Sequence, residues 1–163
     1  MTKARDSQLS LKLDRSAPEP ANRWRDGAAL AFLGGSVRLV LGTPHCDARH
    51  EGDTLNLPLP PQATPRQIQD RAEAWLREQA TQHLRVVIEE KSALAGRRSP
   101  RLALSFAARG HWVEADGRDS LRCNWRLIEQ PMPVIEQAIA RAIATLPRDA
   151  AGFDLFGSPL VTS

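Results

Sequence analysis

The sequence predicts an α+β fold in a single domain, and three observations support this prediction. Short apolar stretches separated by turn residues lie near the N-terminus. One long segment then repeats its apolar residues at helical spacing, and further short strands precede a shorter helix. A β-hairpin and strands, a long helix, a small antiparallel sheet and a short helix, in that order, are typical of α+β domains. A chain of 163 residues is long enough for one such domain with a hydrophobic core.

Composition is that of an ordinary globular protein. Hydrophobic residues make up 42% of the chain and charged residues 25%. Lys and Arg exceed Asp and Glu by 22 − 19 = 3, an excess too small to require an anionic partner. Cys46 and Cys123 lie too far apart to indicate a disulfide framework or zinc-type cysteine spacing. Because no stretch resembles a secretory signal or a membrane span, we expect a cytoplasmic protein with no membrane partner.

The sequence of the N-terminal third indicates a tail followed by short strands. Residues 1–22 include the polar, proline-bearing "DRSAPEPAN", so we expect a flexible tail before a domain over residues 23–163. "ALAFLGG" and "VRLVLG" indicate a hairpin, because Gly34 and Gly35 permit the positive φ of a tight turn. The polar "TPHCDARHEGD" predicts a loop. The alternating "TLNLPL" predicts a third strand, and Pro58 and Pro60 indicate that this strand lies at an edge or ends early.

The strongest local signal is a long helix from residue 65 to about residue 95. Thr64 and Gln67 form a capping-box pattern at its start, and Gly96 marks its end. We expect one break near His83. The apolar positions that recur at helical spacing predict a buried face consisting of Ile68, Ala72, Trp75, Leu76, Leu84, Val87 and Ile88.

The last third predicts a small sheet and a second helix. "RLALSFA", "HWVEA" and "SLRCNWRLI" indicate strands, and "DGRD" indicates a turn. We expect a helix over residues 134–146, which Pro131 and Pro133 precede and Pro147 ends. Its expected apolar surface consists of Ile135, Ala138, Ile139, Ala142, Ile143 and Leu146.

The stretch "RGHWVEADGRDSLRCNWRLIEQPMPVIEQAIARAIATL" resembles the YgjP-like metal-dependent hydrolases, small zinc metallopeptidase-like proteins related to the SprT and WLM types. Trp112 matches the tryptophan of the first family signature, although the Gly-Ser-Cys that follows it there is missing. Asn124, Trp125 and Arg126 match the second signature in "NWRLI", and "VIEQAIA" matches the lead-in to the catalytic helix. Upstream, "WRDGAALAFLGGSVRLVL" and "AWLREQATQHLRVVI" extend the resemblance over most of residues 24–146, which implies a zincin-like fold.

The resemblance also implies which residues stand at the zinc-site positions of the family's His-Glu-x-x-His motif. In the gapless register these positions hold Arg141, Ala142 and Thr145. The chemistry needs two neutral imidazoles one helical turn apart and a carboxylate that accepts a proton from the bound water. Arginine stays protonated, alanine offers no base and threonine is a poor zinc ligand. The family's further downstream histidine also has no counterpart in residues 147–163. We therefore expect a folded homologue without zinc or proteolysis, whose short helix is the former active-site helix.

What the chain does instead remains open between three hypotheses. In the first hypothesis, a protein or peptide partner adds a strand to a sheet edge, and Arg141 faces the former cleft and meets Glu129, Glu136 or a partner's carboxylate. A second hypothesis is a nucleic-acid interface with Arg97, Arg98 and Arg101 as phosphate contacts and Trp112 and Trp125 as stacking residues. A third is a hydrolase with a relocated metal site at His45, Cys46 and His50. Core packing is the competing interpretation of both tryptophans. Packing roles are expected for His83 and Cys123, and a structural role is expected for His111.

Overall fold

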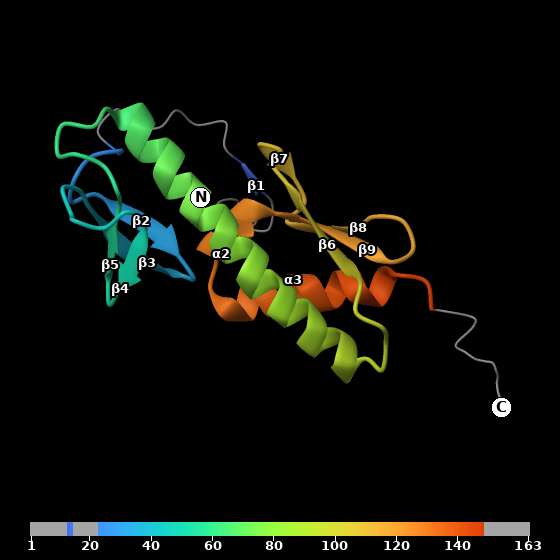
Figure 1. Ribbon diagram of the computed structural model, residues 1–163. Helices are drawn as coiled ribbons and strands as arrows, with labels where there is room; N and C mark the ends of the chain where they lie inside the picture. The colour runs from blue at the N-terminus through green and yellow to red at the C-terminus, as the bar shows by residue number, and fades with distance from the viewer. Residues whose placement is uncertain (1–12, 15–22, 149–163) are drawn as a thin grey trace, which may run out of the picture.

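The computed structural model describes residues 13–14 and 23–148, and within them the α+β prediction is confirmed. Two helices pack together, and a β-sheet lies at each end of the longer one (Figure 1). The elements in chain order are β1 (Leu13–Asp14), β2 (Ala29–Phe32), β3 (Gly35–Val40), β4 (Arg49–Glu51), β5 (Thr54–Asn56), α2 (Pro65–Leu94), β6 (Arg101–Ser105), β7 (Arg109–Gly110), β8 (Val113–Ala115), β9 (Ser120–Asn124), the 3-10 helix η1 (Trp125–Glu129) and α3 (Met132–Thr145).

The two larger sheets are both mixed. The N-terminal sheet has the strand order β2-β3-β5-β4, in which β3 and β5 are parallel. In the second sheet, β6-β9-β8, the β8–β9 pair is antiparallel but β6 and β9 run parallel from Arg101 opposite Ser120 to Ser105 opposite Asn124. The expectation of a small antiparallel sheet is therefore corrected. A crossover through β7 and β8 returns the chain to the start of β6, and such a crossover produces parallel strands.

The predicted N-terminal hairpin forms, but its two turn residues are Leu33 and Gly34, and Gly35 is the first residue of β3. Leu33 and Gly34 have φ values of 50° and 84°, so both turn residues adopt the left-handed conformation of a tight hairpin turn. The segment predicted to be a loop contains one additional strand, since β4 pairs antiparallel with β5. Its residues Arg49, His50 and Glu51 are all exposed and polar. The strand therefore lacks the alternation of apolar and polar residues by which strands are recognised in a sequence.

Helix α2 is continuous from Pro65 to Leu94, so the expected break near His83 does not occur. The His83 ring lies edge-on to the Phe32 ring, with the ring centroids 6.0 Å apart, and this packing is compatible with regular helix. The Thr64–Gln67 capping box is present, and Gly96 follows the helix with a φ of 66°. All seven residues of the predicted apolar face are buried.

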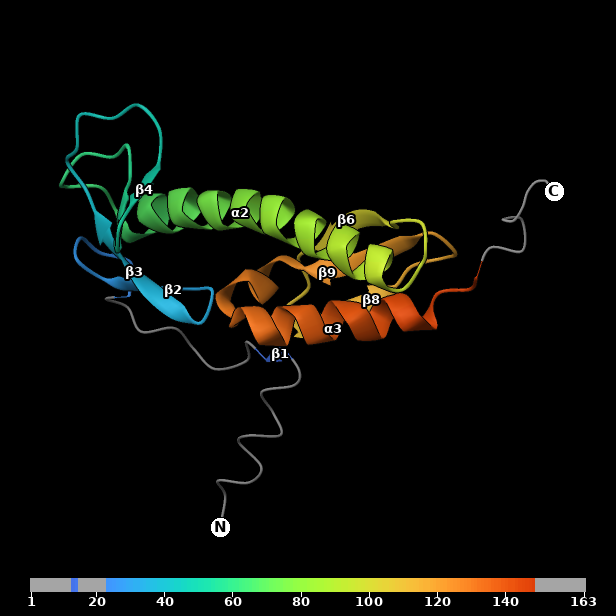
Figure 2. The same ribbon diagram turned by 90° about the horizontal axis from the view of Figure 1, so that it is seen from below.

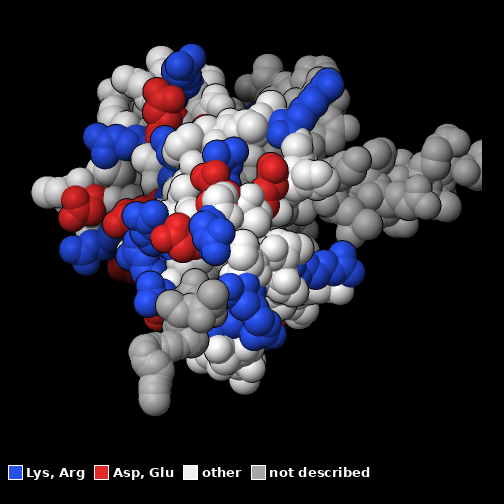
Figure 3. All heavy atoms as spheres, turned by 90° about the vertical axis from the view of Figure 1, so that its right-hand side faces the viewer, with Lys and Arg blue, Asp and Glu red and all other residues white. Residues whose placement is uncertain are grey.

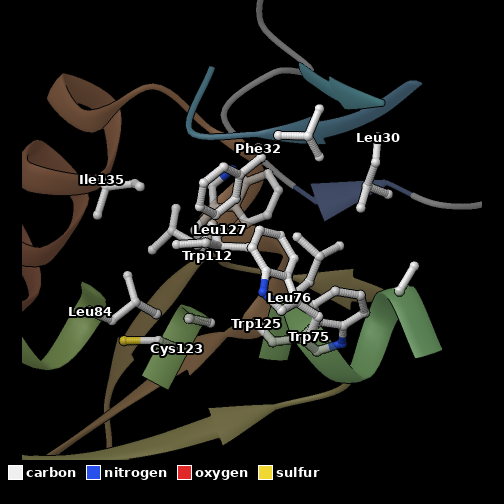
Figure 4. Close-up of a cluster of buried hydrophobic side chains, with 14 of the residues drawn as sticks. Leu30, Phe32, Trp75, Leu76, Leu84, Trp112, Cys123, Trp125, Leu127 and Ile135 are labelled. Carbon is white, nitrogen blue, oxygen red and sulfur yellow. The ribbon is translucent and has the colours of Figure 1, made fainter. Parts of the chain in front are cut away.

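The core lies between α2, η1, α3 and both sheets. Viewed from below, α2 and α3 run side by side and β6, β8 and β9 lie against them (Figure 2). Figure 4 shows Trp75, Trp112 and Trp125 among the leucine side chains of this core. Most of the expected tail, residues 1–12 and 15–22, lies outside the described residues, while Leu13–Asp14 forms β1 against β7. Within the described ranges, no helix is long and apolar enough to cross a bilayer.

Candidate functional site

Helix α3 presents the three residues aligned with the zinc motif, Arg141, Ala142 and Thr145, on two different faces. Arg141 and Thr145 are exposed, while Ala142 is buried with 7% of its surface accessible. The Thr145 hydroxyl donates a hydrogen bond of 2.7 Å to the backbone carbonyl of Ala142 in its own helix. The exposed face of α3 thus carries the Arg141 guanidinium and a Thr145 hydroxyl bonded to its own helix, at the two positions that the sequence resemblance aligns with zinc histidines.

The carboxylates expected to meet Arg141 pair with other cations instead. Glu136 lies 3.9 Å from the Lys91 ammonium, which links α3 to α2. Glu129 lies 3.5 Å from Nη1 of Arg126. Within the described residues Arg141 forms no ion pair with either side chain, so the expectation that it meets Glu129 or Glu136 is wrong: Glu136 pairs with Lys91 on α2, and Glu129 pairs with Arg126 of its own 3-10 helix.

Asn124 serves as a structural cap at the start of the second family signature. Its Oδ1 accepts a hydrogen bond of 3.0 Å from the backbone N–H of Arg126, which caps η1. Its Nδ2 donates a 2.8 Å bond to the carbonyl of Ala107. The side chain is buried, so both bonds satisfy polar groups that water cannot reach. Asn124 therefore fixes the chain direction between β9 and η1.

Arg126 and Trp125 attach η1 to α2. The Arg126 guanidinium lies 4.4 Å from the ring centroid of Trp125 and 3.4 Å from a carboxylate oxygen of Glu73 on α2. Arg77, one turn after Glu73, also approaches the Trp125 ring, at 5.5 Å. With Glu129 on its other side, Arg126 bridges two carboxylates in a mostly buried cluster. Its role in this fold is to hold η1 against α2.

The hairpin turn holds the segment that leads into α3. The backbone N–H groups of Leu33 and Gly34 donate to the carbonyls of Ile128 and Glu129, at 2.8 and 3.0 Å. A Cβ atom on Gly34 would lie 2.9 Å from the Cα of Pro131, the N-cap residue of α3. Trp112 is buried as expected, and the backbone N–H of Asn124 donates to its carbonyl. The family-like residues therefore build a scaffold that positions α3.

Arg97 fixes the other end of α3. Its Nη1 and Nη2 atoms donate hydrogen bonds to the backbone carbonyls of Ile143 and Leu146. The last carbonyls of a helix lack intrahelical partners and carry a partial negative charge, which a guanidinium satisfies in both respects. Arg97 is thus a capping cation contributed by the loop after α2.

Replacing Arg97 by alanine is expected to lower the free energy of unfolding by about 2 kcal/mol, since hydrogen bonds to a charged group and a helix-end charge are lost together. Urea denaturation followed by circular dichroism measures the change. Arg98→Ala is the matched control, because Arg98 is the exposed neighbour and makes no hydrogen bond within the described residues. Equal losses in the two variants would contradict the capping role of Arg97.

The relocated metal site is not assembled. His45 is half-buried, Cys46 is exposed, and the His50 ring packs 5.5 Å from the rings of Phe32 and Trp75. Among the residues that the structure describes, no three His, Cys, Asp or Glu side chains gather in a way that could hold a metal ion. The sequence proximity of His45, Cys46 and His50 therefore does not become a ligand set in space.

Of the residues predicted to contact nucleic acid, some are paired or buried within the fold and one is free to meet a ligand. Arg97 caps α3, and Arg101 lies 3.4 Å from the Asp119 carboxylate. Trp112 and Trp125 are buried, which confirms the core-packing interpretation and leaves neither ring as a stacking surface for bases. Of the three predicted arginines, only Arg98 is exposed and unpaired with respect to the described residues.

The remaining candidate side chains have different environments. His83 is half-buried and packs on Phe32, whereas His111 is exposed beside the buried Trp112. Burial raises the pKa of the Cys123 thiol to about 12, so this thiol stays protonated at neutral pH. Since the thiolate is the nucleophile, Cys123 acts as a small packing residue, as predicted.

Sequence reasoning missed the α2 side chains that complete the Arg126 cluster. Glu73 and Arg77 are four residues apart on α2, with a separation of 3.9 Å between their charged groups. That spacing is a recognisable helical ion pair, but nothing local in the sequence links it to Arg126, 53 residues further along. Likewise, no pattern in the sequence connects Gly34 with Pro131.

Comparison with known proteins identifies a family whose model covers the residues of this scaffold. The family model described as YgjP-like, metallopeptidase domain matches residues 3–140. The match ends one residue before Arg141. No curated protein and no solved structure matches the chain. Because the matched residues span most of the sequence, the chain belongs to the YgjP-like metallopeptidase-domain family.

Proposed function

We propose that this chain is a YgjP-like metallopeptidase homologue that has lost zinc binding and proteolysis and acts in the cytoplasm as a domain that binds a protein or peptide. The observation that carries the proposal is the exposed guanidinium of Arg141 at the position of the first zinc histidine. A permanent cation repels Zn²⁺ and has no lone pair to donate to it.

The neighbouring positions support the same conclusion. Ala142 has no carboxylate to take a proton from a zinc-bound water, and the Thr145 hydroxyl is bonded to the helix backbone. A zinc peptidase needs three protein ligands and an open coordination position. The family match ends at residue 140, which is consistent with a divergent sequence from Arg141 onward.

Strand addition is the binding mode that the fold supports best. β8 is an edge strand of the β6-β9-β8 sheet, and it packs against α3. An edge strand offers backbone N–H and C=O groups to an extended peptide, while the neighbouring side chains select its sequence. Arg141 on the exposed face of α3 favours a peptide with a carboxylate.

Metal analysis of the purified full chain tests the loss of zinc. After equilibration with Zn²⁺ and removal of unbound ions, we expect far less than one zinc per chain by inductively coupled plasma mass spectrometry. Arg141→Ala and Thr145→Ala should leave this value unchanged. The proposal fails if zinc is stoichiometric and either substitution removes it. A His50→Ala variant serves as the control for zinc held by the loop histidines.

A further inference from the structure

A cavity of about 710 Å³ lies where α2 and α3 both end, remote from the β2–β3 hairpin. Three separate segments form it: the loop between α2 and β6, the turn between β8 and β9, and the last turn of α3 with the residues that follow it. Its size lies within the range of small-molecule sites. Figure 3 views this side of the molecule, and more basic than acidic side chains are visible on it.

The charged lining is strongly unbalanced. Arg97, Arg98, Arg118 and Arg148 line the cavity with a single carboxylate, that of Asp119, which gives 4 − 1 = +3. The C-terminal ends of α2 and α3 contribute roughly half a negative charge each, so about two positive charges remain. Asp119 is also shared with Arg101, which further reduces its capacity to neutralise the lining.

Three of these arginines remain available to a ligand. Arg97 is occupied by the carbonyls at the end of α3. Arg98, Arg118 and Arg148 are exposed, and none of them makes a hydrogen bond or ion pair with another residue in the described part of the chain. Each comes from a different segment of the lining, so the folded chain gathers three like charges around one cavity.

We propose that this cavity binds a phosphate group through Arg98, Arg118 and Arg148. The residual charge matches a phosphate dianion, and guanidinium groups donate pairs of hydrogen bonds to phosphate oxygens. The cations at this site are all arginine, the side chain best suited to that geometry. The phosphate belongs either to a small phosphorylated molecule or to a nucleic-acid strand. The site is independent of the proposed peptide-binding function, because the lining does not include Arg141 or Thr145.

Two phosphate probes test the proposal on the full chain at low salt, where screening is weak. Isothermal titration calorimetry with inorganic pyrophosphate reports a small phosphorylated ligand. Fluorescence anisotropy of a short single-stranded oligonucleotide reports a nucleic-acid strand. For the triple variant Arg98→Ala, Arg118→Ala, Arg148→Ala we expect the affinity for the bound probe to fall about tenfold or more, which corresponds to about 1.4 kcal/mol. All three side chains are exposed, so the variant should keep its fold.

The matched control removes the same charge elsewhere. The variant Arg38→Ala, Arg71→Ala, Arg85→Ala loses three exposed arginines of β3 and α2 that do not line the cavity. We expect this control to bind the probe nearly as well as the unchanged chain. Pyrophosphate binding that depends on the cavity arginines supports a small ligand, and oligonucleotide binding alone with that dependence supports a nucleic-acid strand. The proposal is overturned if neither probe binds, or if the control loses as much affinity as the cavity variant.

Discussion

Replacing Gly34 by alanine is expected to lower the free energy of unfolding by about 3 kcal/mol, from two separate costs. Gly34 has a φ of 84°, which a residue with a Cβ atom adopts only with strain. The new methyl group would also lie 2.9 Å from both Cα and Cγ of Pro131, closer than real Cβ atoms approach other heavy atoms. Either the hairpin or the start of α3 must move, and urea denaturation followed by tryptophan fluorescence measures the cost.

Gly52→Ala separates the two costs. Gly52 has a φ of 61° in the turn between β4 and β5, but a Cβ atom there would meet nothing within 4 Å. This control should lose only the conformational part, about 1 kcal/mol. If Gly34→Ala and Gly52→Ala are equally destabilised, the contact between the hairpin and Pro131 does not determine how α3 begins.

The parts of the fold that could be predicted from the sequence depend on short-range patterns. The Thr64–Gln67 capping box, the apolar repeat of α2 and the glycine after it define that helix within a few residues. Gly34 in the hairpin is predictable because only a positive φ fits a two-residue turn between such strands. In each case the residues that determine the structure lie within a few positions of one another.

The remaining features depend on contacts between distant residues. The parallel pairing of β6 with β9 follows from the crossover between them, which the apolar pattern of neither strand encodes. The partners of Glu129 and Glu136, which are Arg126 and Lys91, depend on how η1 and α3 pack against α2. The resemblance in sequence aligns Arg141 with a zinc histidine of the family, but the solvent-facing orientation of its side chain required the packed structure.

Replacing Arg126 by alanine is expected to lower the free energy of unfolding by about 3 kcal/mol, comparable to Gly34→Ala. The Glu73 and Glu129 side chains are only 14% and 12% exposed, and the guanidinium between them is 17% exposed. Removing this cation takes the shared partner from two mostly buried carboxylates, of which Glu73 keeps Arg77 at 3.9 Å, and breaking a buried ion pair costs more than the pair contributes when intact. The stacking of Arg126 on Trp125 is lost as well, and thermal and urea denaturation measure the sum.

Two further variants test whether the loss comes from the buried cluster. Arg126→Lys keeps the charge but cannot donate to both carboxylates in a fixed geometry, so we expect an intermediate loss. Arg66→Ala breaks an ion pair with Asp70 whose side chains are 83% and 63% exposed, and this change should stay within about 0.5 kcal/mol. The cluster does not hold η1 against α2 if Arg126→Ala is as stable as Arg66→Ala. A stability of Arg126→Lys equal to that of the unchanged chain would show that charge alone is sufficient, without the forked geometry of arginine.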